Sequence, residues 1–132
     1  MKYEKSCGTI IIDHDKVLLL RHNKGHWDFP KGHVENDETE VETALRETKE
    51  ETNLDVVVDN SKRYVINYSP KEGIMKDVIL FVAKPITKDV KPQIEEIAEI
   101  HWLTFEEALK KITYNNSRDI LKQVLKDIAD IK

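Results

Sequence analysis

A predicted loop and helix occupy residues 32–54, whose sequence is GHVENDETEVETALRETKEETNL. Thr39 and Glu42 have the spacing of a capping box, which predicts that a helix begins there. Asn53 tolerates the left-handed backbone that ends many helices. The small and apolar side chains that share one arc of this helix are Val41, Ala44, Leu45, Thr48 and Thr52. The segment therefore predicts a helix over residues 39–53 with one buried stripe.

Three glutamates of this helix point the same way, opposite the apolar stripe. At about 100° per residue, Glu47, Glu50 and Glu51 fall within roughly one quadrant. Like charges at this spacing destabilise a helix by about 0.2–0.5 kcal/mol per pair, so stability alone does not favour the arrangement. One interpretation is a solvated acidic face relieved by Arg46 and Lys49. The other is a site for Mg²⁺ or Mn²⁺, hard cations that take oxygen ligands and share them with phosphate.

Apolar and β-branched runs in the rest of the chain predict strands. The strands are expected at 6–12, 17–20, 54–58, 64–68, 78–83 and 97–103. Residues 25–37 predict a long loop, and residues 104–112 and 117–131 predict two further helices. The apolar stripe of the last helix consists of Ile120, Leu121, Val124, Leu125 and Ile128. This order predicts an α/β fold in which helices cover both faces of a mixed sheet.

Length, charge and cysteine content narrow the class of protein. The 132 residues suit a single domain over 1–132, and the net charge of -4 argues against stable nucleic-acid binding through a broad basic face. Cys7 is the sole cysteine and is expected to be a small buried strand residue. The sequence has neither a signal peptide nor an apolar run long enough to span a membrane. We therefore expect a cytoplasmic protein.

The segment at 32–54 resembles the Nudix box, GX5EX7REUXEEXGU, in which U is an aliphatic residue. The spacing is intact over all 23 positions and every charged position is matched. Thr48 stands in place of an aliphatic residue but keeps a β-branched group, and Asn53 replaces a glycine but can adopt the left-handed turn. The likeness continues through HWDFPKGHVE at 26–35 and WLTFEEA at 102–108. The run ending in KGHVE is similar to the branch of the family that splits diadenosine tetraphosphate asymmetrically.

The resemblance implies a Nudix-type α/β/α sandwich with a mixed β-sheet between helices. It also implies hydrolysis of a nucleoside diphosphate linked to another group, by metal-activated water that attacks phosphorus, with Mg²⁺ or Mn²⁺ as cofactor. The implied metal ligands are Glu47, Glu50, Glu51, the carbonyl of Gly32 and the additional glutamate Glu96. Glu47 or Glu51 would also take the proton. Arg46 completes the catalytic set by pairing with Glu38 or Glu50 and orienting the carboxylates.

Positive and aromatic side chains are candidates for holding a nucleotide substrate. Phosphate oxygens need fixed positive partners, which Lys31, His33, Lys76 and Arg21 could supply. An adenine ring offers a π-face, on which Tyr68 could stack, with Tyr64 or Tyr114 as alternatives. Trp27 is expected to hold its loop against the core, and Trp102 to lie in the core itself.

The expected function is hydrolysis of diadenosine tetraphosphate to ATP and AMP. An alternative keeps the chemistry and changes the substrate, to an RNA 5′-triphosphate end, an oxidised nucleoside triphosphate or ADP-ribose. A second alternative is a nucleotide sensor without catalysis. A sensor is expected to lack a motif carboxylate, whereas Glu47, Glu50 and Glu51 are all present. The sequence does not indicate the oligomeric state.

Overall fold

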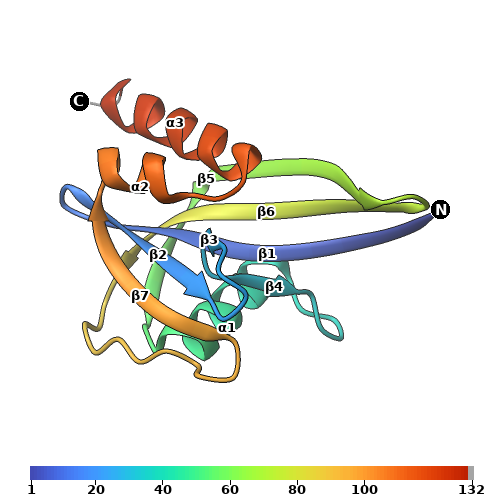
Figure 1. Cartoon of the computed structure of the whole chain (residues 1–132), viewed down its shortest axis with the longest axis horizontal. Helices are drawn as coiled ribbons and strands as arrows, with labels where there is room; N and C mark the ends of the chain where they lie inside the picture. The colour runs from blue at the N-terminus through green and yellow to red at the C-terminus, as the bar shows by residue number, and fades with distance from the viewer. Residues whose placement is uncertain (131–132) are drawn as a thin grey trace.

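The structure is a computed structural model and describes residues 1–130. Its elements are β1 (Lys2–Asp13), β2 (Lys16–His22), β3 (Trp27–Asp28), β4 (Lys31–His33), α1 (Glu40–Thr52), β5 (Val56–Lys71), β6 (Ile74–Pro85), β7 (Ile97–Thr104), α2 (Phe105–Lys111) and α3 (Asn115–Asp130). Figure 1 shows α1 on one side of the sheet and α2 with α3 on the other. The predicted α/β/α sandwich with a mixed sheet is confirmed.

A parallel pair of strands forms the centre of the sheet. β1 runs parallel to β6 from the pair Lys2 and Ile74 to the pair Ile11 and Ala83. The strand order is β3-β2-β1-β6-β5, with β4 paired to β1 and β7 paired to β2. Helices cover both faces of the central strands, so residues 6–11 of β1 form a continuous buried run. Cys7 is fully buried in this run, as predicted, and burial raises the pKa of its thiol to about 11.

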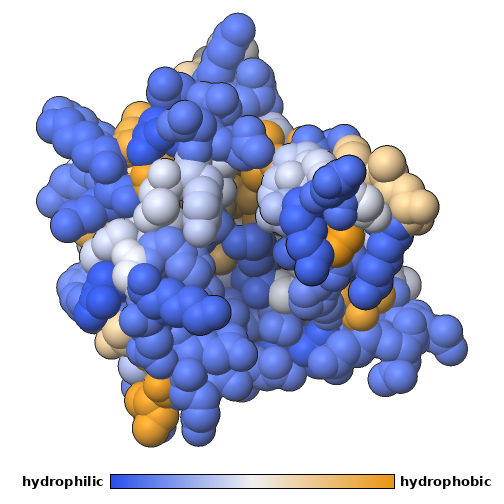
Figure 2. All heavy atoms as spheres, turned by 45° about the vertical axis from the view of Figure 1, so that its right-hand side comes forward, coloured by the Kyte–Doolittle hydropathy of each residue, from blue (hydrophilic) through white to orange (hydrophobic). Residues whose placement is uncertain are grey.

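The edge strand β5 and its neighbour β6 are longer than predicted. The runs at 54–58 and 64–68 fall largely within one strand, β5, whose register with β6 shifts between Asp59 and Arg63. β6 begins at Ile74, four residues before the predicted start. Figure 2, which turns the right-hand side of Figure 1 forward, shows a mostly hydrophilic surface with a hollow near its middle. The added residues of β5 and β6 are largely polar or partly exposed, which weakens the apolar alternation on which the prediction depends.

The loop predicted at 25–37 contains two short strands. β3 pairs with β2 and β4 pairs with β1, both antiparallel. Strands of two and three residues are too short to show a hydrophobic period. Trp27 packs against the core, and Lys111 Nζ lies 5.0 Å from its ring centroid. This agrees with the expected role of Trp27 in holding the segment in place.

Helix α1 begins and ends as predicted but is rotated relative to the predicted face. Thr39 caps the helix in a full capping box, and Asn53 ends it at φ 68°. The buried residues of the helix are Thr43, Ala44, Thr48, Glu51 and Thr52. Leu45, expected in the buried stripe, is 37% exposed. Placing Glu51 opposite the buried face was therefore wrong, because α1 packs its threonine face against β1, where Thr48 and Thr9 share a hydrogen bond of 2.7 Å.

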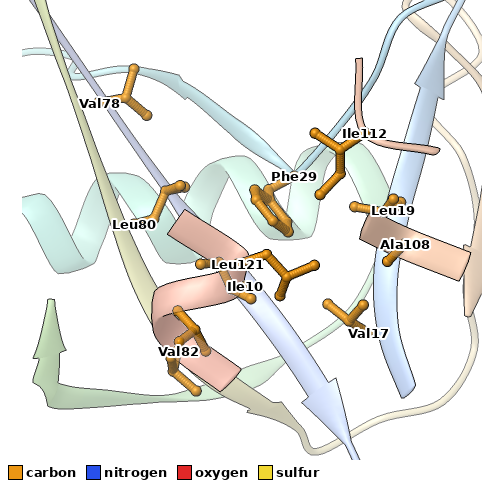
Figure 3. Packing of buried hydrophobic residues seen from close by; sticks show 11 residues of the cluster. Ile10, Val17, Leu19, Phe29, Val78, Leu80, Val82, Ala108, Ile112 and Leu121 are labelled. Carbon is orange, nitrogen blue, oxygen red and sulfur yellow. The ribbon is translucent and has the colours of Figure 1, made fainter. Parts of the chain in front are cut away.

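A large core cluster fills the space between the sheet and α3. Figure 3 shows Phe29 among Leu80, Leu121 and Ile112. The predicted stripe of α3 is confirmed, since Leu121 and Val124 are buried and Ile120, Leu125 and Ile128 pack against the same cluster. The helix begins at Asn115, two residues before the predicted start, and Ile131 lies outside the described residues.

In the segment from β7 to α2, the helix start agrees with the sequence and the burial of Trp102 differs. Trp102, expected in the core itself, is only partly buried and packs against a second core cluster. Thr104 caps α2 in a capping box, so the helix begins within one residue of the predicted position. No helix within residues 1–130 is long and apolar enough to cross a membrane.

Candidate active site

Helix α1 carries its three C-terminal glutamates at different depths. Glu51 is 3% exposed, and its Oε1 accepts a hydrogen bond of 3.0 Å from the backbone N–H of Lys31. The Glu47 side chain is 14% exposed, and the Glu50 side chain is 45% exposed. The carboxylates therefore form a series that runs from the protein interior to solvent.

Arg46 links the carboxylates around it. Its Nε and Nη2 donate to the two oxygens of Glu38, at 2.7 and 3.1 Å. Its Nη1 donates to Glu47 at 3.1 Å and to Glu50 at 3.0 Å. Its Nη2 also donates to the carbonyl of His33 at 3.0 Å, which ties α1 to β4. The hydrogen bonds from Arg46 lower the pKa of Glu38 to about 2. A guanidinium has five N–H donors in a fixed plane, so it can orient several carboxylates at once.

Glu47 and Glu51 form a pair of crowded carboxylates. Burial, followed by the charge of Glu47, raises the pKa of Glu51 to about 8. Burial also raises the pKa of Glu47, although Arg46 opposes the shift. Two adjacent carboxylates with little access to water are costly to ionise unless a cation compensates their charge. The pair is therefore suited to a positive ligand.

Gly32 provides the space that Glu47 occupies. A Cβ built on Gly32 would overlap the carboxyl carbon and both oxygens of Glu47. Any side chain at residue 32 would have to displace that carboxylate, so only glycine allows β4 to approach α1 so closely. The backbone of Gly32 thus lies against one member of the Glu47 and Glu51 pair.

Glu96 lies in a loop that is attached to the same end of α1. The backbone N–H of Gln93 donates to the carbonyl of Glu51 at 3.3 Å, and the N–H of Asn23 donates to the carbonyl of Glu96 at 2.8 Å. The negative charge of Glu96 contributes to the raised pKa of Glu51. The fold therefore brings Glu96 near the pair, although 45 residues separate it from Glu51 in the chain.

The chemistry of these donors fits a hard divalent cation. Glu47 and Glu51 offer carboxylate oxygens, and Glu50 lies on the same side of the helix, bonded to Arg46. Within the described residues, no three His, Cys, Asp or Glu side chains converge into a complete cage. Mg²⁺ and Mn²⁺ rarely need such a cage, because water and substrate phosphate complete their coordination. The arrangement thus fits a cation bound together with a phosphorylated ligand.

A cavity of about 570 Å³ lies between β6 and the start of α3, and Lys31, whose backbone N–H bonds Glu51, forms part of its wall. Its lining includes Lys31, Tyr68 and Lys76, three of the residues expected to bind substrate, together with Tyr114. Burial lowers the pKa of Lys76, and the charge of Lys31 lowers it further. Two ammonium groups and two phenol rings around one hollow match the needs of a polyphosphate joined to an aromatic base.

Three other candidates lie away from this cavity. His33 is exposed and uses its carbonyl to bind Arg46. The Arg21 side chain forms an ion pair with Glu99. The Tyr64 hydroxyl donates to Asp127 at 2.6 Å. The structure thus separates these residues from the group formed by Lys31, Tyr68 and Lys76.

Two buried polar residues of the cavity were missed by the sequence analysis. Asp28 is 2% exposed and Ser117 is 6% exposed, and the Ser117 hydroxyl donates to Asp28 Oδ1 at 3.0 Å. The one available signal was a carboxylate placed between two aromatic residues, Trp27 and Phe29. Ser117 gave no signal, because its role depends on a contact across 89 positions of the chain.

Comparisons with known proteins show which family the sequence of this chain matches. The family model described as NUDIX domain matches residues 2–124. The chain is 32% identical to the asymmetrical bis(5′-nucleosyl)-tetraphosphatase of Sus scrofa over 135 residues, covering 90% of this chain and 91% of that protein. It is 31% identical to an 8-oxo-(d)GTP phosphatase of Mycolicibacterium smegmatis over 116 residues, covering 88% of this chain and 35% of that protein.

A solved structure of an Ap4A hydrolase is also similar to this chain. A binary complex of the Caenorhabditis elegans Ap4A hydrolase superposes with a TM-score of 0.85 at 28% identity, covering 96% of this chain and 98% of that chain. The fold, the intact motif at 32–54 and the similarity over most of the chain lead to one conclusion. The chain belongs to the Nudix family and is a Nudix hydrolase.

Proposed function

We propose that this hydrolase splits diadenosine tetraphosphate into ATP and AMP with the help of a divalent cation. The observation that carries the proposal is that Lys31 links the two parts of the site: its backbone N–H bonds Glu51 of the carboxylate pair, and it lines the cavity together with Tyr68 and Lys76. The similarity to asymmetrical tetraphosphatases over about nine-tenths of both chains supports this substrate.

The carboxylates would hold the cation. Glu47, Glu50 and Glu51 are the proposed ligands, with the Gly32 carbonyl and Glu96 as further ones. Bound there, Mg²⁺ or Mn²⁺ supplies positive charge to the phosphate oxygens and lowers the pKa of water. Glu47 or Glu51 would accept the proton of the attacking water.

The remaining residues would orient the carboxylates and bind the substrate. Arg46 holds Glu47 and Glu50 through Nη1, so it would keep both carboxylates aimed at the cation. Lys31 and Lys76 would bind the negatively charged phosphate chain, and Tyr68 would stack on an adenine. His33 remains a proposed contact of a long substrate that reaches beyond the cavity.

Product analysis tests the proposal. The purified protein is incubated with Mg²⁺ and diadenosine tetraphosphate, and the nucleotides are separated by ion-pair chromatography. Equal amounts of ATP and AMP are expected, with oxygen from labelled water in one product. Two molecules of ADP would refute the asymmetric cleavage, and the absence of turnover would refute the substrate.

Parallel substrates and one variant separate the alternatives. Triphosphorylated RNA, ADP-ribose and 8-oxo-dGTP are tested under the same conditions, the last because of the similarity to an 8-oxo-(d)GTP phosphatase. Turnover of one of these instead would keep the carboxylate chemistry and change the substrate. Glu50→Gln is expected to abolish turnover, whereas a sensor would show none in either form. The single domain and the cytoplasmic location remain predictions of the sequence.

A further inference from the structure

The buried carboxylate of Asp28 is absent from the mechanism above, yet it lies in the wall of the cavity. Asp28 is 2% exposed and ends β3, directly before the segment that leads to Lys31. A buried carboxylate is costly unless donors surround it. Its position therefore requires partners, and those partners show what it holds in place.

Asp28 accepts hydrogen bonds from three directions. Its Oδ1 accepts from the backbone N–H of Phe29 at 2.8 Å and from the Ser117 hydroxyl at 3.0 Å. Its Oδ2 accepts from Lys31 Nζ at 2.6 Å. The short bond to Lys31 is of the charge-assisted kind, which is stronger than a bond between neutral groups. Asp28 thus connects β3, the start of β4 and the first turn of α3.

Lys31 is consequently held at both ends. Its backbone N–H donates to Glu51 in the carboxylate pair, while its ammonium group is held by Asp28. The Lys31 side chain remains 23% exposed and lines the cavity together with Lys76. A free lysine side chain would sample many rotamers and lose that freedom on binding phosphate. A lysine already held by a carboxylate loses much less.

We propose that Asp28, supported by Ser117, is a positioning residue that fixes the ammonium group of Lys31 for binding the polyphosphate of the substrate. This inference rests on the proposed function, because it assigns Lys31 to the phosphate chain. Asp28 acts through Lys31 and does not touch the reacting atoms. It sets the affinity for phosphate more than the rate of the chemical step.

The main test compares Asp28→Asn with a matched control. Asn keeps the shape and the acceptor oxygen but turns an amide toward the ammonium group. Asp59→Asn makes the same change in another Asp and Lys pair at the same spacing, since Asp59 binds Lys62 at 2.9 Å outside this cavity. We expect Asp28→Asn to raise KM about tenfold with kcat changed less than threefold. Asp59→Asn should leave both unchanged.

A binding measurement separates this inference from the proposed function. Calorimetric titration with ATP in EDTA measures phosphate affinity without turnover. We expect the Kd to rise about tenfold in Asp28→Asn and about threefold in Ser117→Ala. If the wild-type protein binds ATP and the two variants weaken this binding as expected, but the wild-type protein does not cleave diadenosine tetraphosphate, the proposed function fails and the role of Asp28 stands.

A double-mutant cycle tests the route through Lys31. In a Lys31→Met background, Asp28→Asn and Ser117→Ala should raise the Kd less than twofold, because the group that they position is gone. Equal effects in both backgrounds would overturn the proposal. An unchanged ATP affinity in a folded Asp28→Asn protein would also overturn it. Circular dichroism establishes folding, and Ser117→Ala decides the question if Asp28→Asn does not fold.

Discussion

Replacing Glu51 by Gln should stabilise the metal-free protein while removing its activity. Glu51 is 3% exposed, and burial beside Glu47 raises its pKa from 4.5 to about 8. A carboxyl group with a raised pKa binds its proton more tightly in the folded than in the unfolded chain. The free energy of unfolding therefore falls as the pH rises from about 4.5 to about 8, and it levels off above that.

The expected gain in the free energy of unfolding follows from the pKa shift of Glu51. One pKa unit corresponds to about 1.4 kcal/mol, so the full shift sets an upper bound of about 5 kcal/mol at pH 8. Buried carboxylates recover part of their hydration by local rearrangement, and we expect about 2–3 kcal/mol. Gln keeps an oxygen that can accept from the Lys31 N–H, so the substitution removes the charge without losing this hydrogen bond.

Guanidinium unfolding of wild type and Glu51→Gln in EDTA, at pH 5 and pH 8, measures the difference directly. The variant should be more stable at pH 8 by the stated amount and nearly equal to wild type at pH 5. Glu50→Gln, the same change at a side chain that is 45% exposed, should not reproduce this pH-dependent gain. A stability difference that is the same at both pH values would refute the reasoning. Added Mg²⁺ should stabilise wild type more than Glu51→Gln at pH 8.

Three further substitutions test other contacts. Gly32→Ala should push the Glu47 carboxylate away by about 1 Å and lower kcat/KM about 100-fold in steady-state kinetics. In a Glu47→Asp background the shorter side chain withdraws the carboxylate from residue 32, so Gly32→Ala should cause a much smaller further loss of kcat/KM. Arg46→Lys should lower kcat at least tenfold with little change in the melting temperature, because an ammonium group cannot bond three carboxylates in one plane. A kcat equal to that of the wild-type protein would contradict this prediction. Tyr64→Phe should lower the free energy of unfolding, measured with urea, by about 1 kcal/mol and leave kcat/KM unchanged, since the Tyr64 hydroxyl bonds Asp127 away from the cavity. A loss of activity would instead place Tyr64 in the site.

The local signals of the sequence predicted their elements well. The capping box at Thr39 and the left-handed Asn53 lie where the sequence placed them, and α2 begins one residue from its predicted start. These features depend on residues three or four positions apart, which the sequence shows directly. The prediction failed at the short strands β3 and β4 and in the polar part of β5, because hydrogen bonds to neighbouring strands form those segments without a clear apolar period.

The sequence by itself determined the family motif, the α/β class and the helix that carries Glu47, Glu50 and Glu51. It did not determine that Glu51 would be buried, because the burial comes from β4 and the 93–96 loop closing over the end of α1. Asp28 and Ser117, 89 positions apart, meet only when α3 packs across the sheet. Spacing along a helix is a local property of the chain, whereas burial and charge pairing depend on which distant segments pack together. Tertiary structure therefore decided the depth of the carboxylates, the raised pKa of Glu51 and the partners of Lys31.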